Sequence, residues 1–403
     1  MNRLLVITDL FPPAFAPRVA YMCRLLQPRW EVTVVTEQTA ATISSVAADD
    51  VEVIRLRQEG RERPGLRLLN LLGNQLFLTK DRWFRRRLTD VIEGRQFDAV
   101  VCFSYYLFPL PAARWIARSL GVPLVVDLRD IVEQIPRDTV RRKIYNCVRL
   151  KWLNRLRRNR ILKEAALVTT VSPFHQEQLK RVNPNTHLIY NGYDEQMFMP
   201  QPVKVDRFRI VFAGRLKSAY YQGVYQRPDM LLDALERLDN DMLNHISCDW
   251  YVDDVSRLVL EQVLTHRSER IVSCCNIYAH QPYICMPRIL NEASLVLVLT
   301  SPEVRGVLTT KLYEAIGVEK PVLCIRNDMG DMAQLIQQTG AGMAASTVED
   351  IEHFVRQTYA EWMRNGYTHN PTNQTWRSLL TRRIGAEQLD ALLRNVLRQH
   401  RRI

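Results

Sequence analysis

Apolar and polar positions follow one order along the chain, in which short apolar runs alternate with longer segments of helical spacing. The first run, "RLLVITD", is continuous in apolar residues, which is typical of a parallel strand buried on both faces. Pro17 suits the first position of a helix, and "RVAYMCRLLQ" then carries apolar residues at helical spacing. Further strands are predicted at "EVTVVT", "FDAVVCF", "PLVVDLRD", "ALVTTVS" and "HLIYNG", with helices at "PAARWIARSLG" and "PFHQEQLKRV".

The same pattern begins again at "FRIVFAG". Helices at "DMLLDALERL", "DVSRLVLEQVLTH", "KLYEAIG" and "DMAQLIQQTG" alternate with strands at "HISCDWYV", "SLVLVLT" and "PVLCIR". Thr347 and Asp350 predict a capping box at the start of one more helix, "VEDIEHFVRQTYAEWM". This alternation predicts an α/β fold of two doubly wound, Rossmann-like domains, each with a parallel sheet covered by helices on both faces.

A polar stretch with two prolines, "YDEQMFMPQPVKVDR", separates the halves and sets a boundary near residues 195–206. We predict a first domain at 1–198, a second at 199–370, and a helical segment at 371–403 that packs back on the first domain. Ligands of doubly wound domains bind at the carboxyl ends of the strands. We therefore expect the two sets of strand ends to face a shared cleft.

The net charge and the cysteine content limit the kinds of binding partner and the cellular compartment that we expect. The 403 residues carry a net charge of +12, with a pI of about 9.4. Such an excess favours nucleic acid, phosphorylated small molecules or an acidic membrane surface, and charge alone does not choose among them. The eight cysteines lie mostly in apolar runs without a C-x-x-C pair, and the adjacent Cys274 and Cys275 have no second pair to complete a zinc site. We expect reduced thiols in a cytoplasmic protein, because the first apolar run is too short for a signal peptide.

The sequence lacks the motifs of several protein classes that commonly have this fold. Neither "DLFPPAFAP" nor "AGRLKSAYY" supplies the G-x-G-x-x-G of dinucleotide enzymes, and no Walker loop is present. No nucleic-acid module stands out, so we expect no nucleic-acid partner. The remaining common class of proteins with two doubly wound domains is an enzyme that binds a nucleotide-sugar in its second domain.

A series of ordered landmarks then resembles the GT-B-fold glycosyltransferases of the family 4 type found in bacterial polysaccharide synthesis. These landmarks are "FPPAFAPRVAYMCRLL", "VVDLRD", "VTTVSPFHQEQLK", "IYNGYDEQMF", "IVFAGRL", "YAHQPYICMPRILNEASLVLVLTS" and "KLYEAIGVEKPVL". The resemblance implies an acceptor-binding first domain and a second domain that binds the donor. Each landmark is weak by itself, and the specificity comes from their order and spacing.

The resemblance places the donor diphosphate at "FAGRL". Gly214 lets the backbone approach a ligand, and the fork of Arg215 suits phosphate oxygens. Lys217 and Arg227 are further candidates, whereas the family often has a lysine where this chain has Tyr220. A surface arginine on a loop is the alternative for Arg215.

The resemblance places the donor ribose at the helix of "RGVLTTKLYEAIG". Thr309 or Thr310 would cap this helix, so that its first N–H groups and Lys311 favour a phosphate. Glu314 matches the family's ribose-binding glutamate, and a surface pair with Lys311 is the alternative. We expect Gly317 to end the helix in a left-handed conformation.

The first acid of the family's glutamate–seven residues–glutamate pattern is replaced by Gly306. Many polysaccharide-locus members also have "GVL" here, so Gly306, Val307 and Leu308 are retained as donor-loop residues. Glu303 has the wrong spacing to replace the missing acid. The sugar-facing catalytic group near this loop is therefore undefined.

The first domain supplies the remaining candidates. Ala16 and the proline after it replace two family glycines, and Arg18 could contact the phosphate in their place. Asp130 matches a common cleft aspartate of the family and is our candidate catalytic residue, with a structural network between Arg129 and Asp130 as the alternative. Tyr105 stands where the family often has a histidine.

The resemblance also implies retention of anomeric configuration without a metal or other cofactor. Arg215, Lys217, Lys311 and helix N–H groups would stabilise the leaving diphosphate of a UDP- or GDP-linked sugar. Asp253 and Asp254 are interpreted as a helix cap rather than a D-x-D metal motif.

Residues 137–163 contain eleven Lys or Arg and one acid. Ile144, Val148, Trp152 and Leu156 recur at helical spacing, which predicts a basic amphipathic helix. Docking to an anionic membrane near a lipid-linked acceptor and simple packing with a solvated charged face are both open. The same features could also bind nucleic acid, which stays open as the less favoured alternative.

These observations favour a cytoplasmic, membrane-peripheral glycosyltransferase that uses a glycan or polyprenyl-linked acceptor in cell-surface polysaccharide synthesis. Two alternatives stay open, a catalytically silent GT-B binding protein and another GT-B enzyme such as a sugar-nucleotide epimerase.

Overall fold

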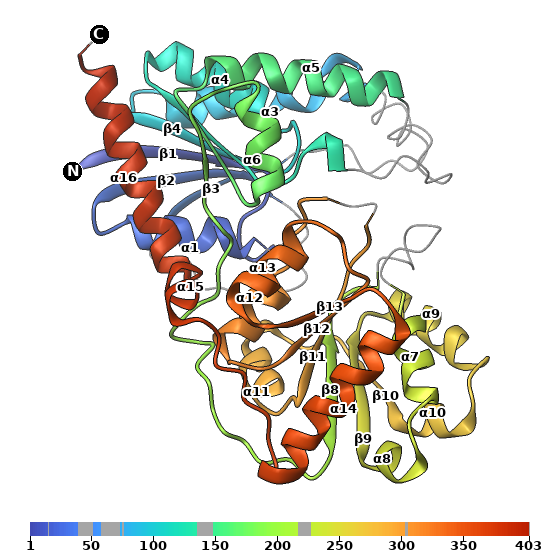
Figure 1. Cartoon of the computed structure of the whole chain (residues 1–403). Helices are drawn as coiled ribbons and strands as arrows, with labels where there is room; N and C mark the ends of the chain where they lie inside the picture. Colours follow the sequence, from blue (N-terminus) through green and yellow to red (C-terminus); the bar gives the residue numbers. More distant parts are fainter. Residues whose placement is uncertain are drawn as a thin grey trace. The chain divides into compact units, whose positions relative to one another are not determined.

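The computed structural model describes residues 1–14, 16–38, 51–57, 73–74, 76–134, 148–216, 227–302 and 305–402. Within these ranges the chain forms two compact units (Figure 1). The first unit runs to Tyr190 and resumes at Arg382, and the second contains Asn191–Thr381. The predicted domain limits at residues 198 and 370 lie near these changes of unit.

The first unit is built on a parallel sheet in the order β3-β2-β1-β4-β5-β6-β7. Its strands are β1 (Asn2–Thr8), β2 (Trp30–Glu37), β3 (Glu52–Leu56), β4 (Ala99–Ser104), β5 (Leu124–Leu128), β6 (Leu167–Thr170) and β7 (Thr186–Leu188). Its helices are α1 (Pro17–Leu26), α3 (Thr79–Ile92), α4 (Leu110–Leu120), the 3-10 turn η2 (Val132–Gln134), α5 (Val148–Glu164), α6 (Pro173–Lys180) and α16 (Arg382–His400).

Strand β1 shows how the first sheet buries both of its faces. Leu4 and Val6 belong to a core that α1 and α16 complete, while Leu5 and Ile7 belong to the opposite core with α3 and α4. Successive side chains of a strand alternate between faces, so a continuous apolar run fills both cores. Figure 1 shows α16 running beside α1 on one face of this sheet.

The second unit repeats the design with the strand order β10-β9-β8-β11-β12-β13. Its strands are β8 (Phe208–Ala213), β9 (Ile246–Val252), β10 (Cys275–Ala279), β11 (Leu295–Leu299), β12 (Val322–Ile325) and β13 (Gly342–Ala345). Its helices are α7 (Asp229–Glu236), α8 (Asn240–His245), α9 (Asp254–Leu264), α10 (Glu269–Cys274), the 3-10 turn η5 (Tyr283–Cys285), α11 (Met286–Asn291), α12 (Thr310–Gly317), α13 (Asp331–Thr339), α14 (Val348–Asn365) and α15 (Gln374–Leu379).

The predicted class of two doubly wound parallel sheets is confirmed, because every strand pair in both units is parallel. The capping box of Thr347 and Asp350 is also confirmed at the start of α14. In the described part of the chain, no helix has the length and apolar character that crossing a bilayer requires.

One helix end differs from the prediction. Gly317 is the last residue of α12, and the left-handed residue that follows is Glu319, at a φ of 54°. A Cβ at Gly317 would lie 2.6 Å from the Tyr193 ring and 3.0 Å from Phe198 Cβ. Gly317 is therefore required for close packing and not for reversing the backbone.

Candidate functional site

Gly214 follows β8 directly, beside the point where the strand order of the second sheet reverses. Its φ of 141° is one that side chains disfavour. A Cβ atom here would lie 2.6 Å from Nζ and 2.7 Å from Cε of Lys311. The absence of a side chain thus leaves the space that the Lys311 amine occupies, at the edge where doubly wound sheets bind ligands.

Lys311 comes from the first turn of α12, 97 residues after Gly214 in the sequence. Its amine also lies 5.4 Å from the centre of the Phe212 ring. Thr309 is the N-cap of α12, as predicted, but its side chain makes no cap hydrogen bond, and its Oγ1 is buried without a partner in the described residues. The start of α12 therefore combines a lysine charge with N–H groups that the Thr309 side chain does not cap, which suits an anion.

Glu314 lies one turn further along α12 and is 5% exposed. Glu314 is therefore a buried residue and does not lie on the exposed surface of the helix. Gly306 has a φ of 76°, so the loop before α12 adopts a left-handed conformation where the family pattern has a glutamate. Leu308 is buried and Val307 is half-buried in the same loop.

The two arginines predicted for the donor site have acidic neighbours. The Nε atom of Arg215 lies 3.1 Å from Asp253 Oδ2, and the Arg215 side chain is 70% exposed. Asp253 also caps α9, as predicted. Arg227 pairs with Asp229 at 2.7 Å, at the start of α7, and no described contact joins it to Lys311 or Gly214. Residue 217, the predicted lysine helper, lies outside the described residues, as do 220 and 303.

A second polar group lies at the carboxyl edge of the first sheet. Arg129, which follows β5, has its Nη2 atom 3.8 Å from Asp9 Oδ1 and its guanidinium 5.6 Å from the centre of the Tyr105 ring. Asp9 and Tyr105 follow β1 and β4, where the strand order of this sheet reverses. Burial raises the pKa of Asp9, and the charge of Arg129 opposes this rise.

The predicted catalytic residue Asp130 is half-buried beside this group. Its Oδ1 accepts a hydrogen bond of 2.6 Å from Gln134 Nε2, and the Gln134 side chain also contacts His175 Nε2. Burial lowers the pKa of His175 to about 4, against the opposing charges of Asp130 and Glu133. The described contacts thus link Arg129 to Asp9 and Asp130 to Gln134, and no contact between Arg129 and Asp130 is among them.

Arg18 has a different environment from the one predicted. Its Nη2 lies 2.7 Å from Asp127 Oδ2 and its Nε lies 3.1 Å from Asp127 Oδ1, while Nη1 donates to the Tyr190 carbonyl at 3.0 Å. Arg18 is 4% exposed and Asp127 is fully buried. Ala16, the N-cap of α1, is also buried. A guanidinium fixed in this way does not favour the phosphate role predicted for Arg18.

Sequence reasoning missed Asp9, Asp127 and His175. Asp9 had a signal, because an acid directly after a buried first strand lies at the ligand-binding edge. No local sequence pattern pointed to Asp127 or His175, because each lies inside a regular element. Asp127 contacts Arg18, 109 residues away in the sequence, and His175 contacts Gln134, 41 residues away.

The two doubly wound parallel sheets have the architecture of the GT-B fold. Residues 15–192 match the family described as glycosyl transferase 4-like domain. This match, together with the fold, confirms the resemblance predicted from the landmarks of the sequence. No curated protein matches the chain in sequence.

Solved structures share the architecture over the whole chain. HepE from Anabaena in complex with UDP-glucose is 14% identical with a TM-score of 0.67, and the match covers 98% of this chain and 100% of HepE. Sucrose-phosphate synthase from Thermosynechococcus elongatus is 14% identical with a TM-score of 0.70, over 99% and 100% of the two chains. UDP-GlcNAc 2-epimerase from Methanocaldococcus jannaschii is 11% identical with a TM-score of 0.55, over 98% and 99%. At these identities the likeness concerns the fold.

Proposed function

We propose that this protein is a retaining glycosyltransferase that moves a sugar from a UDP- or GDP-linked donor to a glycan or polyprenyl-linked acceptor in cell-surface polysaccharide synthesis. The observation that carries the proposal is the packing of the Lys311 amine against Gly214, with Glu314 one turn further along the same helix. The glycosyl transferase 4-like domain and the UDP-glucose complex of HepE support a nucleotide-sugar as the donor.

In this proposal the second unit binds the donor through its diphosphate and ribose. Lys311, Arg215 and the first N–H groups of α12 face the diphosphate and stabilise the charge that develops as it leaves, without a metal ion. Arg215 exchanges its exposed pair with Asp253 for phosphate oxygens at little cost, because exposed ion pairs contribute only about 0–1 kcal/mol. Glu314 accepts hydrogen bonds from the ribose hydroxyls.

The polar edge of the first unit binds the acceptor in this proposal. Asp9 and Asp130 are the two carboxylates there, and each can orient an acceptor hydroxyl or accept its proton. Asp130 keeps the catalytic role proposed for it, and Asp9 is added because burial raises its pKa toward the range in which a base is useful.

Binding of a donor panel tests the function. The full chain is titrated with UDP-, GDP- and other nucleotide-sugars, and donor hydrolysis is then measured with those that bind. We expect one nucleotide class to bind and Glu314→Ala to weaken it, because the carboxylate no longer accepts from the ribose. If no nucleotide-sugar binds, the transferase proposal is wrong; unchanged affinity in Glu314→Ala would remove the ribose role alone.

We also propose that the basic helix docks to an anionic membrane surface at the inner face of the cell membrane. Residues 137–147 of the predicted basic stretch lie outside the described residues, and α5 provides seven basic residues and one acid. On α5, Trp152 is 62% exposed and Leu156 is 45% exposed, whereas Ile161 and Leu162 are buried. Of the predicted stripe, Trp152 and Leu156 therefore do not pack on the described part of the first unit, which favours docking over the packing alternative.

A neighbouring segment extends this exposed apolar surface. Arg157 of α5 donates a hydrogen bond of 2.7 Å to the Leu76 carbonyl, and the adjacent Phe77 is 61% exposed. Aromatic and leucine side chains among basic residues are typical of interfacial docking.

Liposome flotation tests the docking. We expect binding that requires anionic lipid and that Trp152→Ser with Leu156→Ser reduces. The matched control is Leu258→Ser on α9, whose side chain is 66% exposed without belonging to this stripe. Equal flotation with neutral and anionic vesicles, or of all variants, contradicts the proposal.

A second candidate function is a sugar-nucleotide epimerase, since one such enzyme shares the fold. The left-handed Gly306 in place of an acid favours a third, a silent binding protein. Epimerisation of the bound donor without an acceptor identifies the former, and nucleotide binding without turnover identifies the latter.

A further inference from the structure

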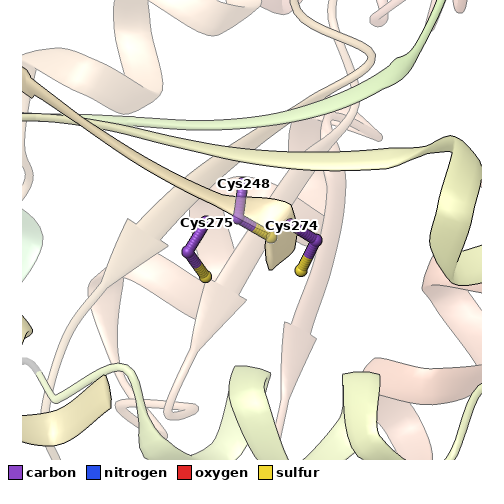
Figure 2. Close-up of side chains that lie close together, drawn as sticks. All are labelled: Cys248, Cys274 and Cys275. Carbon is purple, nitrogen blue, oxygen red and sulfur yellow. The ribbon is translucent and has the colours of Figure 1, made fainter. Parts of the chain in front are cut away.

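Three cysteine side chains meet at one edge of the second sheet. Cys248 lies on β9, Cys274 ends α10 and Cys275 begins the edge strand β10. Their sulfur atoms all lie within 4.8 Å of one another, and Figure 2 shows them gathered in one group. Cys275 is the register partner of Cys248, and the direct passage from α10 into β10 adds the sulfur of Cys274.

We propose that this three-cysteine cluster (Cys248, Cys274 and Cys275) binds a soft, thiophilic metal ion through three thiolates, with monovalent copper as the preferred ion. A metal–sulfur bond of about 2.3 Å places three sulfurs of a planar site roughly 4 Å apart. The observed limit of 4.8 Å means that each sulfur–sulfur distance needs to close by less than about 1 Å. The proposal does not depend on the transferase function.

The ligand set selects the ion. Structural zinc sites take four ligands, and in the described part of the chain no histidine, carboxylate or fourth cysteine belongs to the group. Soft thiolates suit monovalent copper as well as zinc, and of these two ions monovalent copper is the one that accepts three sulfurs in a plane without a fourth ligand. A purely sulfur set of three therefore fits copper better than zinc.

The burial of the cluster suits a bound metal ion. Cys248 is fully buried and Cys274 is 2% exposed, while the partly exposed Cys275 gives an ion access from outside. The positively charged guanidinium of Arg207 acts electrostatically on Cys274. Arg207 donates a hydrogen bond of 2.7 Å from Nη2 to the Ile246 carbonyl at the start of β9, which fixes its position.

Anaerobic titration of the full, reduced chain with monovalent copper, in competition with a chromogenic copper chelator, tests the site. We expect one tightly bound equivalent in the unaltered protein and an affinity lower by about 100-fold or more in Cys275→Ser, since even outer partners of a metal site change affinity 10- to 100-fold. Cys285→Ser is the matched control, because Cys285 is also partly exposed and lies outside the cluster. Equal affinity in all three proteins, or tighter binding of zinc than of copper, overturns the proposal.

A second measurement needs no variant and therefore holds even if Cys275→Ser fails to fold. Copper should protect the three cluster thiols from alkylation and leave Cys285 reactive, as read by mass spectrometry. X-ray absorption should show three sulfurs at about 2.3 Å. Two sulfurs only, unprotected cluster thiols, or a disulfide within the cluster of the reduced protein would each refute the site.

Discussion

Gly214→Ala tests whether the donor site depends on the position of the Lys311 amine. The new Cβ would lie 2.6 Å from Nζ, a separation that side chains do not adopt, so the lysine end must move. The φ of 141° also strains any side chain. The change therefore has two separable effects, a backbone cost at residue 214 and a displaced charge at residue 311.

The magnitudes follow from these two effects. Backbone strain of this kind costs about 1–3 kcal/mol of folding free energy. A hydrogen bond to a charged group contributes about 1.5–3 kcal/mol, so losing the lysine contact to the diphosphate should weaken nucleotide binding about 10- to 150-fold. Calorimetric titration with the tightest-binding nucleoside diphosphate measures the second effect, and urea unfolding measures the first.

Gly340→Ala is the matched control. Gly340 has a left-handed φ of 66° in the same unit, but a Cβ there would meet nothing within 4 Å. We expect it to lower stability and leave nucleotide affinity unchanged. Lys311→Met should reproduce the binding loss, and adding Gly214→Ala to it should cost little further affinity, because both changes remove one contact. Full affinity in Gly214→Ala, or fully additive losses in the double variant, would refute the role given to Lys311.

Three further outcomes follow from buried or strained groups. Arg18→Met should lower the free energy of unfolding by about 3–5 kcal/mol, because it leaves Asp127 as a buried, unpaired charge. Urea unfolding of Arg18→Met measures this loss. The double variant Arg18→Met with Asp127→Asn should recover part of the lost stability, because it removes the unpaired charge. The pKa of His175 in the folded protein is about 4, below the ordinary 6.5, so the unfolded chain binds more protons between pH 4 and 6.5. The free energy of unfolding should therefore rise by about 3 kcal/mol from pH 4 to 6.5. If the free energy of unfolding of His175→Gln depends on pH in the same way, this explanation is wrong. Gly306→Ala and Gly306→Glu should each lose about 1–2 kcal/mol by thermal unfolding because the φ of 76° is unfavourable to both, and a loss confined to glutamate would show that charge, not backbone, is the cause.

The parallel strands were predictable because strands buried on both faces have continuous apolar sequences, as in "LLVIT" and "LVLVL". Gly214 and Lys311 were both chosen from the sequence, but their contact was not predictable from local pattern, since it depends on how β8 and α12 pack. Gly317 shows the opposite error: a glycine at a helix end suggested a backbone reversal, whereas the neighbouring side chains required its small size. The third sulfur of the cysteine cluster was missed because Cys248 comes from another strand, 26 residues before Cys274.

Helix α16 follows the whole second unit in the sequence yet belongs to the first unit. Its Asp390 accepts a hydrogen bond of 2.8 Å from the buried indole of Trp30, and Leu389 and Leu393 complete the core beside α1. On the ribosome, the part of this core that α16 completes must therefore stay open while the whole second unit is synthesised. The second unit has no such delay, since its ends meet in the bridge between Tyr193 and Thr381. The later unit can therefore be complete in sequence before the earlier one, and a chain released before α16 is made would expose part of the apolar core of the first unit to chaperones and proteases.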